Sequence, residues 1–202
     1  MPLASLSYAT MTASALRAAP RISGPRGIMD PARKQALFEQ TVLPHLNAAF
    51  NLARWLIRNS HDAEDAVQEA CLKAFRSFET FQGGDSGDGR AWLLAVVRNT
   101  CFTFLSRKGN RQAEEFDERL HGADGETVDA EALLLNQAAA DSLRDCIEAL
   151  PLEFREAVVL RELEELSYKE ISGIARVPVG TVMSRLARAR ERLRRCLSGA
   201  TP

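Results

Sequence analysis

Arginines are concentrated near the C-terminal end of this 202-residue chain, where they recur at helical spacing. Seven arginines and one acidic residue, Glu191, lie between Arg176 and Arg195. On a helix over residues 179–197, one face would collect Thr181, Ser184, Arg185, Arg188, Arg192 and Arg195. Hydroxyl side chains at the start of a helix, with arginines behind them, suit insertion into the major groove, where they reach base edges and phosphates. The pattern predicts a DNA-binding helix.

A capped helix and a turn precede this arginine-rich segment. Residues 167–170 (Ser-Tyr-Lys-Glu) have the pattern of a capping box, which opens a short helix. Residues 176–178 (Arg-Val-Pro) predict a tight turn. The second helix has an apolar face that we expect to be buried, made of Val179, Val182, Met183, Leu186, Leu193 and Leu197. An arginine-rich face can also be an ordinary solvated surface, but the cap, the turn and the order of hydroxyls and arginines favour a helix-turn-helix.

The N-terminal half shows further helical periodicity. Apolar residues recur at helical spacing from Ala32 to Arg58, with Pro44 separating two helices. The next helix is expected to have Asp62 as its cap and to end near Phe78. Its buried side is predicted to hold Ala63, Val67, Ala70, Ala74, Phe75 and Phe78, and its other side Asp65, Gln68, Glu69, Lys73 and Arg76. A glycine-rich loop follows, and then a helix from about residue 90 to Ser106.

Charge is distributed unevenly along the chain. The formal net charge of -1 would by itself argue against nucleic-acid binding. However, residues 111–145 hold ten acidic and three basic side chains, and the segments on both sides are basic. Residues 107–128 have no periodicity and predict a linker. Helical patterns resume near Ala130 and again at residues 153–163.

Several classes of protein are excluded. No run of 18 apolar residues exists, so we expect no membrane insertion. Three scattered histidines, no phosphate-binding loop after a strand and no paired nucleophile argue against an enzyme. No Cys-x-x-Cys motif or Cys/His cluster exists, so we expect no metal and no cofactor. The cysteines are interpreted as small apolar side chains in helices, in a reducing cytoplasm, with redox sensing as the alternative: Cys71, Cys101, Cys146 and Cys196.

Two sets of motifs resemble one family. Residues 62–69, 92–93 and 98–99 resemble region 2 of bacterial sigma factors of the extracytoplasmic-function (ECF) group. Residues 150–151, 167–171 and 179–190 resemble region 4 of the same group. The motifs occur in the family's order and together cover roughly residues 35–197. Met183 departs from the pattern, because lysine is frequent there in the family.

The resemblance implies an all-α protein with two small helical domains joined by a flexible acidic linker. Residues 1–30 would be a disordered N-terminal extension, 31–107 region 2, 108–129 the linker and 130–202 region 4 with its helix-turn-helix. Residues 1–28 also look superficially like a transit peptide, and a start at Met29 is a further alternative. The implied function is a cytoplasmic sigma factor that binds core RNA polymerase, directs transcription initiation at promoter DNA in a stress response and is controlled by an anti-sigma factor.

The resemblance also assigns site residues. Region 4 would bind the duplex -35 element through Thr181, Ser184, Arg185, Arg188 and Arg192. Region 2 would capture the melted -10 strand, with its flipped base, through Phe81, Arg98, Asn99 and Arg107. The surface that meets the polymerase clamp helices would include Asp65, Gln68 and Glu69, although periodicity alone favours a solvated face. Trp92 is interpreted as a core residue rather than a DNA contact.

Two other functions stay open. A stand-alone helix-turn-helix regulator would account for residues 167–197 but would leave the region 2 motifs without a role. A sigma-like decoy that sequesters an anti-sigma factor would not need an intact basic recognition face.

Overall fold

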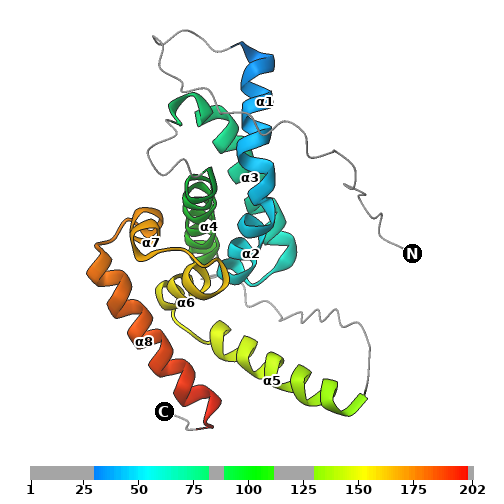
Figure 1. The fold of residues 1–202 in the computed structure, drawn as a ribbon, viewed down its shortest axis with the longest axis vertical. Helices are drawn as coiled ribbons and strands as arrows, with labels where there is room; N and C mark the ends of the chain where they lie inside the picture. Colours follow the sequence, from blue (N-terminus) through cyan, green and yellow to red (C-terminus); the bar gives the residue numbers. More distant parts are fainter. Residues whose placement is uncertain (1–29, 82–88, 112–129, 200–202) are drawn as a thin grey trace.

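The computed structural model describes residues 30–81, 89–111 and 130–199, and every regular element in these ranges is helical (Figure 1). The helices are α1 (Pro31–Val42), α2 (Leu46–Ile57), α3 (Ser60–Ser77), α4 (Gly89–Arg111), α5 (Ala130–Glu148), α6 (Leu152–Val158), α7 (Tyr168–Ala175) and α8 (Val179–Leu197). Short 3-10 turns over Leu43–His45 and Phe78–Thr80 follow α1 and α3, and a π-helical turn over Val159–Leu163 extends α6. The all-α prediction is confirmed.

Some predictions fall on residues outside these ranges, namely the N-terminal extension over residues 1–29, most of the glycine-rich loop and linker residues 112–129. The start of the linker was placed too early. Helix α4 continues past Ser106 to Arg111, and Lys108 on its exposed side forms an ion pair with Asp62 of α3 at 2.9 Å. Among the described helices, none combines the length and the apolar character needed to cross a membrane.

Helix α3 begins earlier than the sequence suggested, and Asp62 is not its cap. Arg58 ends α2 in the left-handed conformation, with φ of 68°, and Asn59 follows in an extended one. The Asn59 side chain accepts a hydrogen bond from the Asp62 backbone N–H at 2.9 Å. Asn59 is therefore the cap, because an extended residue with a side-chain oxygen satisfies the first free backbone amides of a helix.

Helices α1–α4 form the first domain, in which α2, α3 and α4 pack against one another. Four alanines of α3 are fully buried and allow close helix packing: Ala63, Ala66, Ala70 and Ala74. An aromatic cluster lies at the end of α3, where Trp92 contacts Phe78 and Phe81 with ring centroids 6.0 and 4.8 Å away. Phe75 was wrongly expected in the core. It is 37% exposed, and its ring contacts Phe38 of α1 edge-to-face at 5.1 Å between centroids, with the Lys34 ammonium 5.0 Å from the ring centroid.

Helices α5–α8 form the second domain. The capping box is confirmed: the Ser167 hydroxyl accepts from the Glu170 N–H at 3.3 Å, and the Glu170 carboxylate accepts from the Ser167 N–H at 2.7 Å. Helix α7 ends at Arg176, which is left-handed with φ of 55°, and α8 has the expected bounds. The apolar face of α8 is narrower than predicted. Its buried residues are Val182, Leu186 and Ala189, one stripe at helical spacing, and Met183 lies beside this stripe with 53% of its surface exposed.

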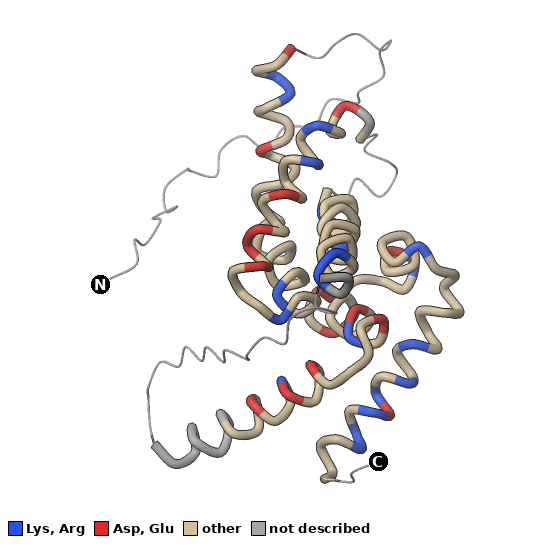
Figure 2. The backbone as a smooth tube through the Cα atoms, turned by 180° about the vertical axis from the view of Figure 1, so that it is seen from behind, with Lys and Arg blue, Asp and Glu red and all other residues tan. Residues whose placement is uncertain are grey.

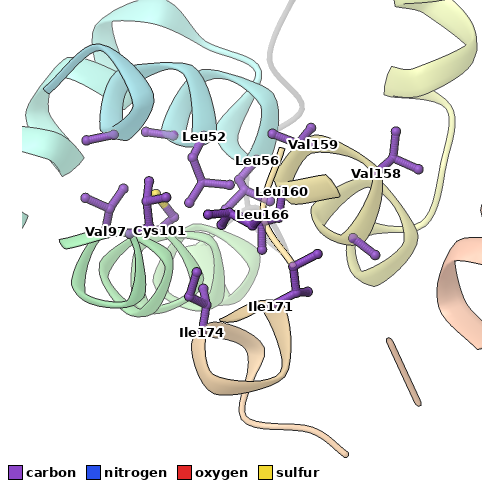
Figure 3. Close-up of a cluster of buried hydrophobic side chains, with 14 of the residues drawn as sticks. Leu52, Leu56, Val97, Cys101, Val158, Val159, Leu160, Leu166, Ile171 and Ile174 are labelled. Atoms are coloured by element: carbon purple, nitrogen blue, oxygen red, sulfur yellow. The ribbon is translucent and has the colours of Figure 1, made fainter. Parts of the chain in front are cut away.

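The two domains pack against each other through one continuous hydrophobic cluster (Figure 3). Helix α2 contacts α6, and α4 contacts α7. The first domain contributes Leu52, Leu56, Val97 and Cys101, and the second contributes Val158, Val159, Leu160, Leu166, Ile171 and Ile174. Burial of apolar surface is the main stabilising contribution to such a contact. The sequence predicted two domains but gave no indication of this interface.

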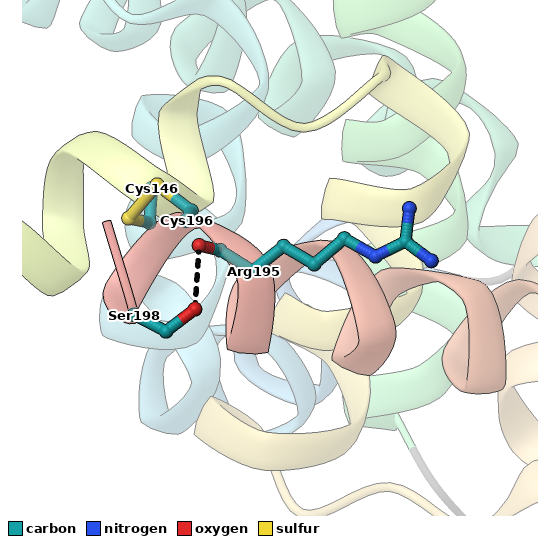
Figure 4. Close-up of a disulfide and its surroundings, with 4 residues drawn as sticks. All are labelled: Cys146, Arg195, Cys196 and Ser198. Carbon is teal, nitrogen blue, oxygen red and sulfur yellow. Dashed lines mark hydrogen bonds between the residues drawn. A yellow bond between two sulfur atoms is a disulfide. The ribbon is translucent and has the colours of Figure 1, made fainter. Parts of the chain in front are cut away.

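A disulfide between Cys146 and Cys196 joins the end of α5 to the end of α8 (Figure 4). The interpretation of these two cysteines as separate apolar side chains was therefore wrong. They are 50 residues apart in sequence, and the contact between α5 and α8 brings them together. Cys71 and Cys101 are thiols, as expected, and burial raises the pKa of the Cys101 thiol to about 12.

Reduction of this disulfide should destabilise the second domain. A cross-link that closes a 50-residue loop restricts the unfolded chain and stabilises the folded state by about 2–4 kcal/mol. We expect dithiothreitol to lower the midpoint of thermal unfolding of the wild type, followed by circular dichroism. The double variant Cys146→Ser/Cys196→Ser should unfold at the lower temperature with or without reductant. Equal midpoints for the wild type in both conditions would contradict the prediction.

Candidate nucleic-acid and polymerase interfaces

Helix α8 presents the basic face that the sequence predicted, and its arginines follow the helix along most of its length (Figure 2). Ser184 and Arg188 are exposed, and Thr181 is half-buried. The Ser184 hydroxyl donates to the Thr181 carbonyl at 2.9 Å, and the Arg192 guanidinium lies 5.5 Å from the Phe154 ring centroid. The side chains of Thr181, Ser184, Arg188 and Arg192 therefore share a surface that is accessible to solvent.

The remaining arginines of α8 have acidic partners. Arg190 forms an ion pair with Glu162 at 2.6 Å, a hydrogen bond that raises the pKa of the guanidinium. Arg194 and Arg195 both bind Glu191 on the same helix. No described carboxylate lies within ion-pairing distance of Arg188 or Arg192. These two residues are thus the arginines of the predicted set that are best placed to meet an external phosphate.

Arg185 is held differently from the rest of the predicted -35 set. Its guanidinium lies 3.7 Å from the carboxylate of Glu156, a residue of α6 that is almost fully buried. Only 23% of the Arg185 side chain is exposed. In this arrangement Arg185 faces the boundary between the two domains rather than the outer surface of α8.

The four residues assigned to the -10 strand do not form one surface here. Phe81 packs on Trp92, and the Asn99 side-chain oxygen lies 3.4 Å from the Arg98 guanidinium. Arg98 points toward the second domain, where its Nε donates to Glu156 at 2.6 Å. Arg107 is exposed and lies nine residues after Arg98 on α4. This spacing places it on the opposite side of the helix from Arg98 and about 13 Å further along the helix axis.

The face of α3 assigned to polymerase is exposed, as periodicity suggested. Asp65, Gln68 and Glu69 all lie on it. Lys73 forms an ion pair with Glu69 at 2.7 Å, and its hydrogen bond, with smaller contributions from the charges of Lys73 and Arg107, lowers the pKa of the Glu69 carboxyl. Arg107, assigned to DNA, therefore lies near the predicted polymerase surface.

An apolar groove that sequence reasoning missed adjoins this face. It has a volume of about 430 Å³ and is lined by Phe38, Gln68, Cys71, Leu72 and Phe75. Leu72 is 59% exposed, although it sits among polar residues of α3. A large apolar residue on the polar side of an amphipathic helix is the signal that indicates such a contact surface before the structure is known.

Comparisons with known proteins match two separate parts of the chain to two families. Residues 41–111 match the Sigma-70 region 2 family, and residues 140–193 match the Sigma-70, region 4 family. The ECF RNA polymerase sigma-E factor of Escherichia coli is 39% identical over 141 residues, which cover 65% of this chain and 72% of that protein. The ECF RNA polymerase sigma factor SigE of Mycolicibacterium smegmatis is 34% identical over 157 residues, which are 78% of this chain but 60% of the length of SigE.

A solved structure shares the fold. The sigma factor RpoE from Bartonella quintana, crystallised in complex with the anti-sigma factor NepR, superposes with a TM-score of 0.65 at 28% identity. The match covers 80% of this chain and 96% of that one. Both sigma regions, the curated relatives and this structure lead to the same conclusion: the chain belongs to the ECF RNA polymerase sigma factors.

Proposed function

We propose that this sigma factor binds core RNA polymerase through α3 and the apolar groove beside it. As a member of its family, it is a non-enzymatic transcription initiation factor that binds core polymerase and promoter DNA. The observation that supports the location is the exposed pair Leu72 and Phe75, next to the polar residues Asp65, Gln68 and Glu69. Apolar side chains ringed by polar ones are typical of protein interfaces.

Promoter DNA is proposed to meet both domains. Helices α7 and α8 act as a helix-turn-helix on the duplex -35 element, with Thr181, Ser184, Arg185, Arg188 and Arg192 toward the DNA. The melted -10 strand meets Phe81, Arg98, Asn99 and Arg107. Two of these residues, Arg98 and Arg185, face Glu156 in the structure. Separation of the two domains would release Arg98 from Glu156, whereas Arg185 and Glu156 belong to the same domain.

The division of the chain into regions, the inhibitory partner and the cellular setting are further parts of the proposal. The proposed division into region 2, a linker and region 4 is supported by the family matches over residues 41–111 and 140–193, with the end of region 2 moved from residue 107 to the end of α4 at Arg111. An anti-sigma factor is the proposed inhibitory partner, since the similar RpoE was crystallised with one. The protein is proposed to act in the cytoplasm, where core polymerase works, and in a stress response.

Run-off transcription tests the proposed function directly. Core RNA polymerase is incubated with a fragmented genomic library, with and without the protein, and the transcripts are sequenced. We expect a new set of start sites that depends on the protein and shares upstream elements. If the protein redirects no transcription but binds an anti-sigma factor, it is a decoy. Specific binding to a duplex without polymerase would instead identify a stand-alone regulator.

A further inference from the structure

Two large apolar side chains are exposed at the start of α8, beside the proposed -35 residues. Val179 is 40% exposed and Met183 is 53% exposed. They are four residues apart, so they lie next to each other on one side of the helix. The buried stripe of α8 consists of other residues, namely Val182, Leu186 and Ala189. Val179 and Met183 therefore form an apolar patch that the packing of the second domain does not cover.

No bulky side chain separates this apolar patch from the face of α8 that holds Ser184 and Arg188. Met183 and Ser184 are about 100° apart around the helix axis, and only Gly180 and Ala187 lie between them on the neighbouring turns. Both are exposed. A Cβ atom added to Gly180 would contact no atom within 4 Å beyond its immediate neighbours on the helix, so no described contact requires a glycine there. A missing side chain allows close approach to the backbone, so one external partner can contact the apolar patch and Ser184 together.

The charges around the apolar patch favour an anionic partner. Residues 171–190 contain no acidic residue, and the first turn of α8 carries no carboxylate. Arg176 and Arg188 come before and after the patch, are exposed and form no ion pair with a described residue. Duplex DNA offers phosphates to these arginines and, in its major groove, the C5-methyl group of thymine to an apolar side chain. An apolar protein surface would match the patch but not the arginines.

We propose that Met183 contacts the C5-methyl group of a thymine in the -35 element and gives this sigma factor a preference for a T·A pair at that position. The inference rests on the proposed function, which places the first turns of α8 in the major groove. Thymine is the one base of DNA that presents a methyl group there. The Met183 side chain has no hydrogen-bond donor, and its three rotatable bonds let it adapt to an apolar neighbour. Val179 extends the same apolar surface toward the end of the helix.

The proposed contact acts through a single methyl group. Removal of one buried methyl group should weaken promoter binding about 4-fold, which corresponds to about 0.8 kcal/mol. Exchange of the whole base pair should weaken binding more, by about 5- to 150-fold, because the new bases also bring different hydrogen-bonding groups. Deoxyuridine differs from thymidine only in the missing methyl group. It therefore separates the contact with Met183 from the hydrogen bonds of the base.

Promoters that carry deoxyuridine in place of thymidine test the proposal. Run-off transcription by core polymerase and the protein, on a library with a randomised -35 element, first identifies the positions at which thymine is preferred. Each of these thymidines is then replaced in turn. For the wild type, one replacement should weaken holoenzyme binding about 4-fold, and for Met183→Ala the same replacement should have no effect. Leu197→Ala is the matched control, because Leu197 is 50% exposed at the other end of α8, and it should respond to deoxyuridine as the wild type does.

The outcomes separate this contact from the proposed function. Protein-dependent transcription without a thymine preference, or an equal effect of deoxyuridine on the wild type and Met183→Ala, would overturn the role of Met183 and leave the proposed function intact. Weaker binding of Met183→Ala to core polymerase would assign the apolar patch to a protein contact instead. No protein-dependent transcription from the library would overturn both proposals. Thermal unfolding by circular dichroism should give equal midpoints for the wild type and both variants, since both replaced side chains are exposed.

Discussion

Replacement of Leu72 by glutamate should weaken binding to core RNA polymerase by about 100-fold. Leu72 is the most exposed large apolar residue described in the structure, and it lines the groove between α1 and α3. A residue that acts as a hot spot at the centre of an interface contributes about 2–4 kcal/mol, which is a factor of about 30 to 1,000 in affinity. A carboxylate at this position would also be buried without a partner in the complex.

Titration of labelled core polymerase with wild type and Leu72→Glu measures this effect. The matched control is Leu197→Glu, because Leu197 is also half-exposed but lies at the far end of α8. Both substitutions are at exposed positions, so both variants should unfold at the temperature of the wild type. Equal affinities for the wild type and Leu72→Glu, or an equal loss in both variants, would show that the groove is not the polymerase-binding surface.

The helices themselves were predictable because their signals are local. Apolar spacing, the capping box at residues 167–170 and the turn at residues 176–178 depend on neighbours within one or two helical turns. The bounds of α8 followed from these signals, as did the start of α5 at Ala130. Errors occurred where two local signals competed, as at Asn59 and Asp62, since both side chains can cap a helix.

Contacts between distant segments were not predictable in the same way. The disulfide between Cys146 and Cys196 depends on how α5 and α8 pack, and their 50-residue separation carries no pattern. The contacts of Glu156 are similar, because Arg98 is 58 residues away in the other domain. Residue types on α8 predicted a basic face, but the pairing of Arg185 and Arg190 depended on Glu156 and Glu162, two residues of other elements.

The pairing of the arginines decides which substitution gives the clearest test of DNA recognition. Arg185→Ala would combine two effects, because it removes a proposed DNA contact and also leaves buried Glu156 with one partner fewer. Arg188 is exposed on the same face and has no carboxylate partner among the described residues. Its loss should therefore affect DNA binding without disturbing the domain.

Arg188→Ala should reduce transcription from promoters that depend on the -35 element by about 10- to 100-fold, with binding to core polymerase unchanged. An arginine that contacts a base edge or a phosphate contributes about 1–3 kcal/mol, and loss of a phosphate contact should lower the salt dependence of promoter binding by about one charge. Run-off assays on promoters recovered from the genomic library measure the first effect, and holoenzyme binding at several salt concentrations measures the second.

Arg194→Ala is the matched control for this experiment. Arg194 lies on the same helix and is also exposed, but it binds Glu191 within α8, so its removal costs the same formal charge without a proposed DNA contact. A selective loss in Arg188→Ala would place the hydroxyl-and-arginine face of α8 against DNA. An equal loss in both variants would mean that α8 attracts DNA only through its net charge. A loss of core binding in Arg188→Ala would assign this helix to polymerase instead.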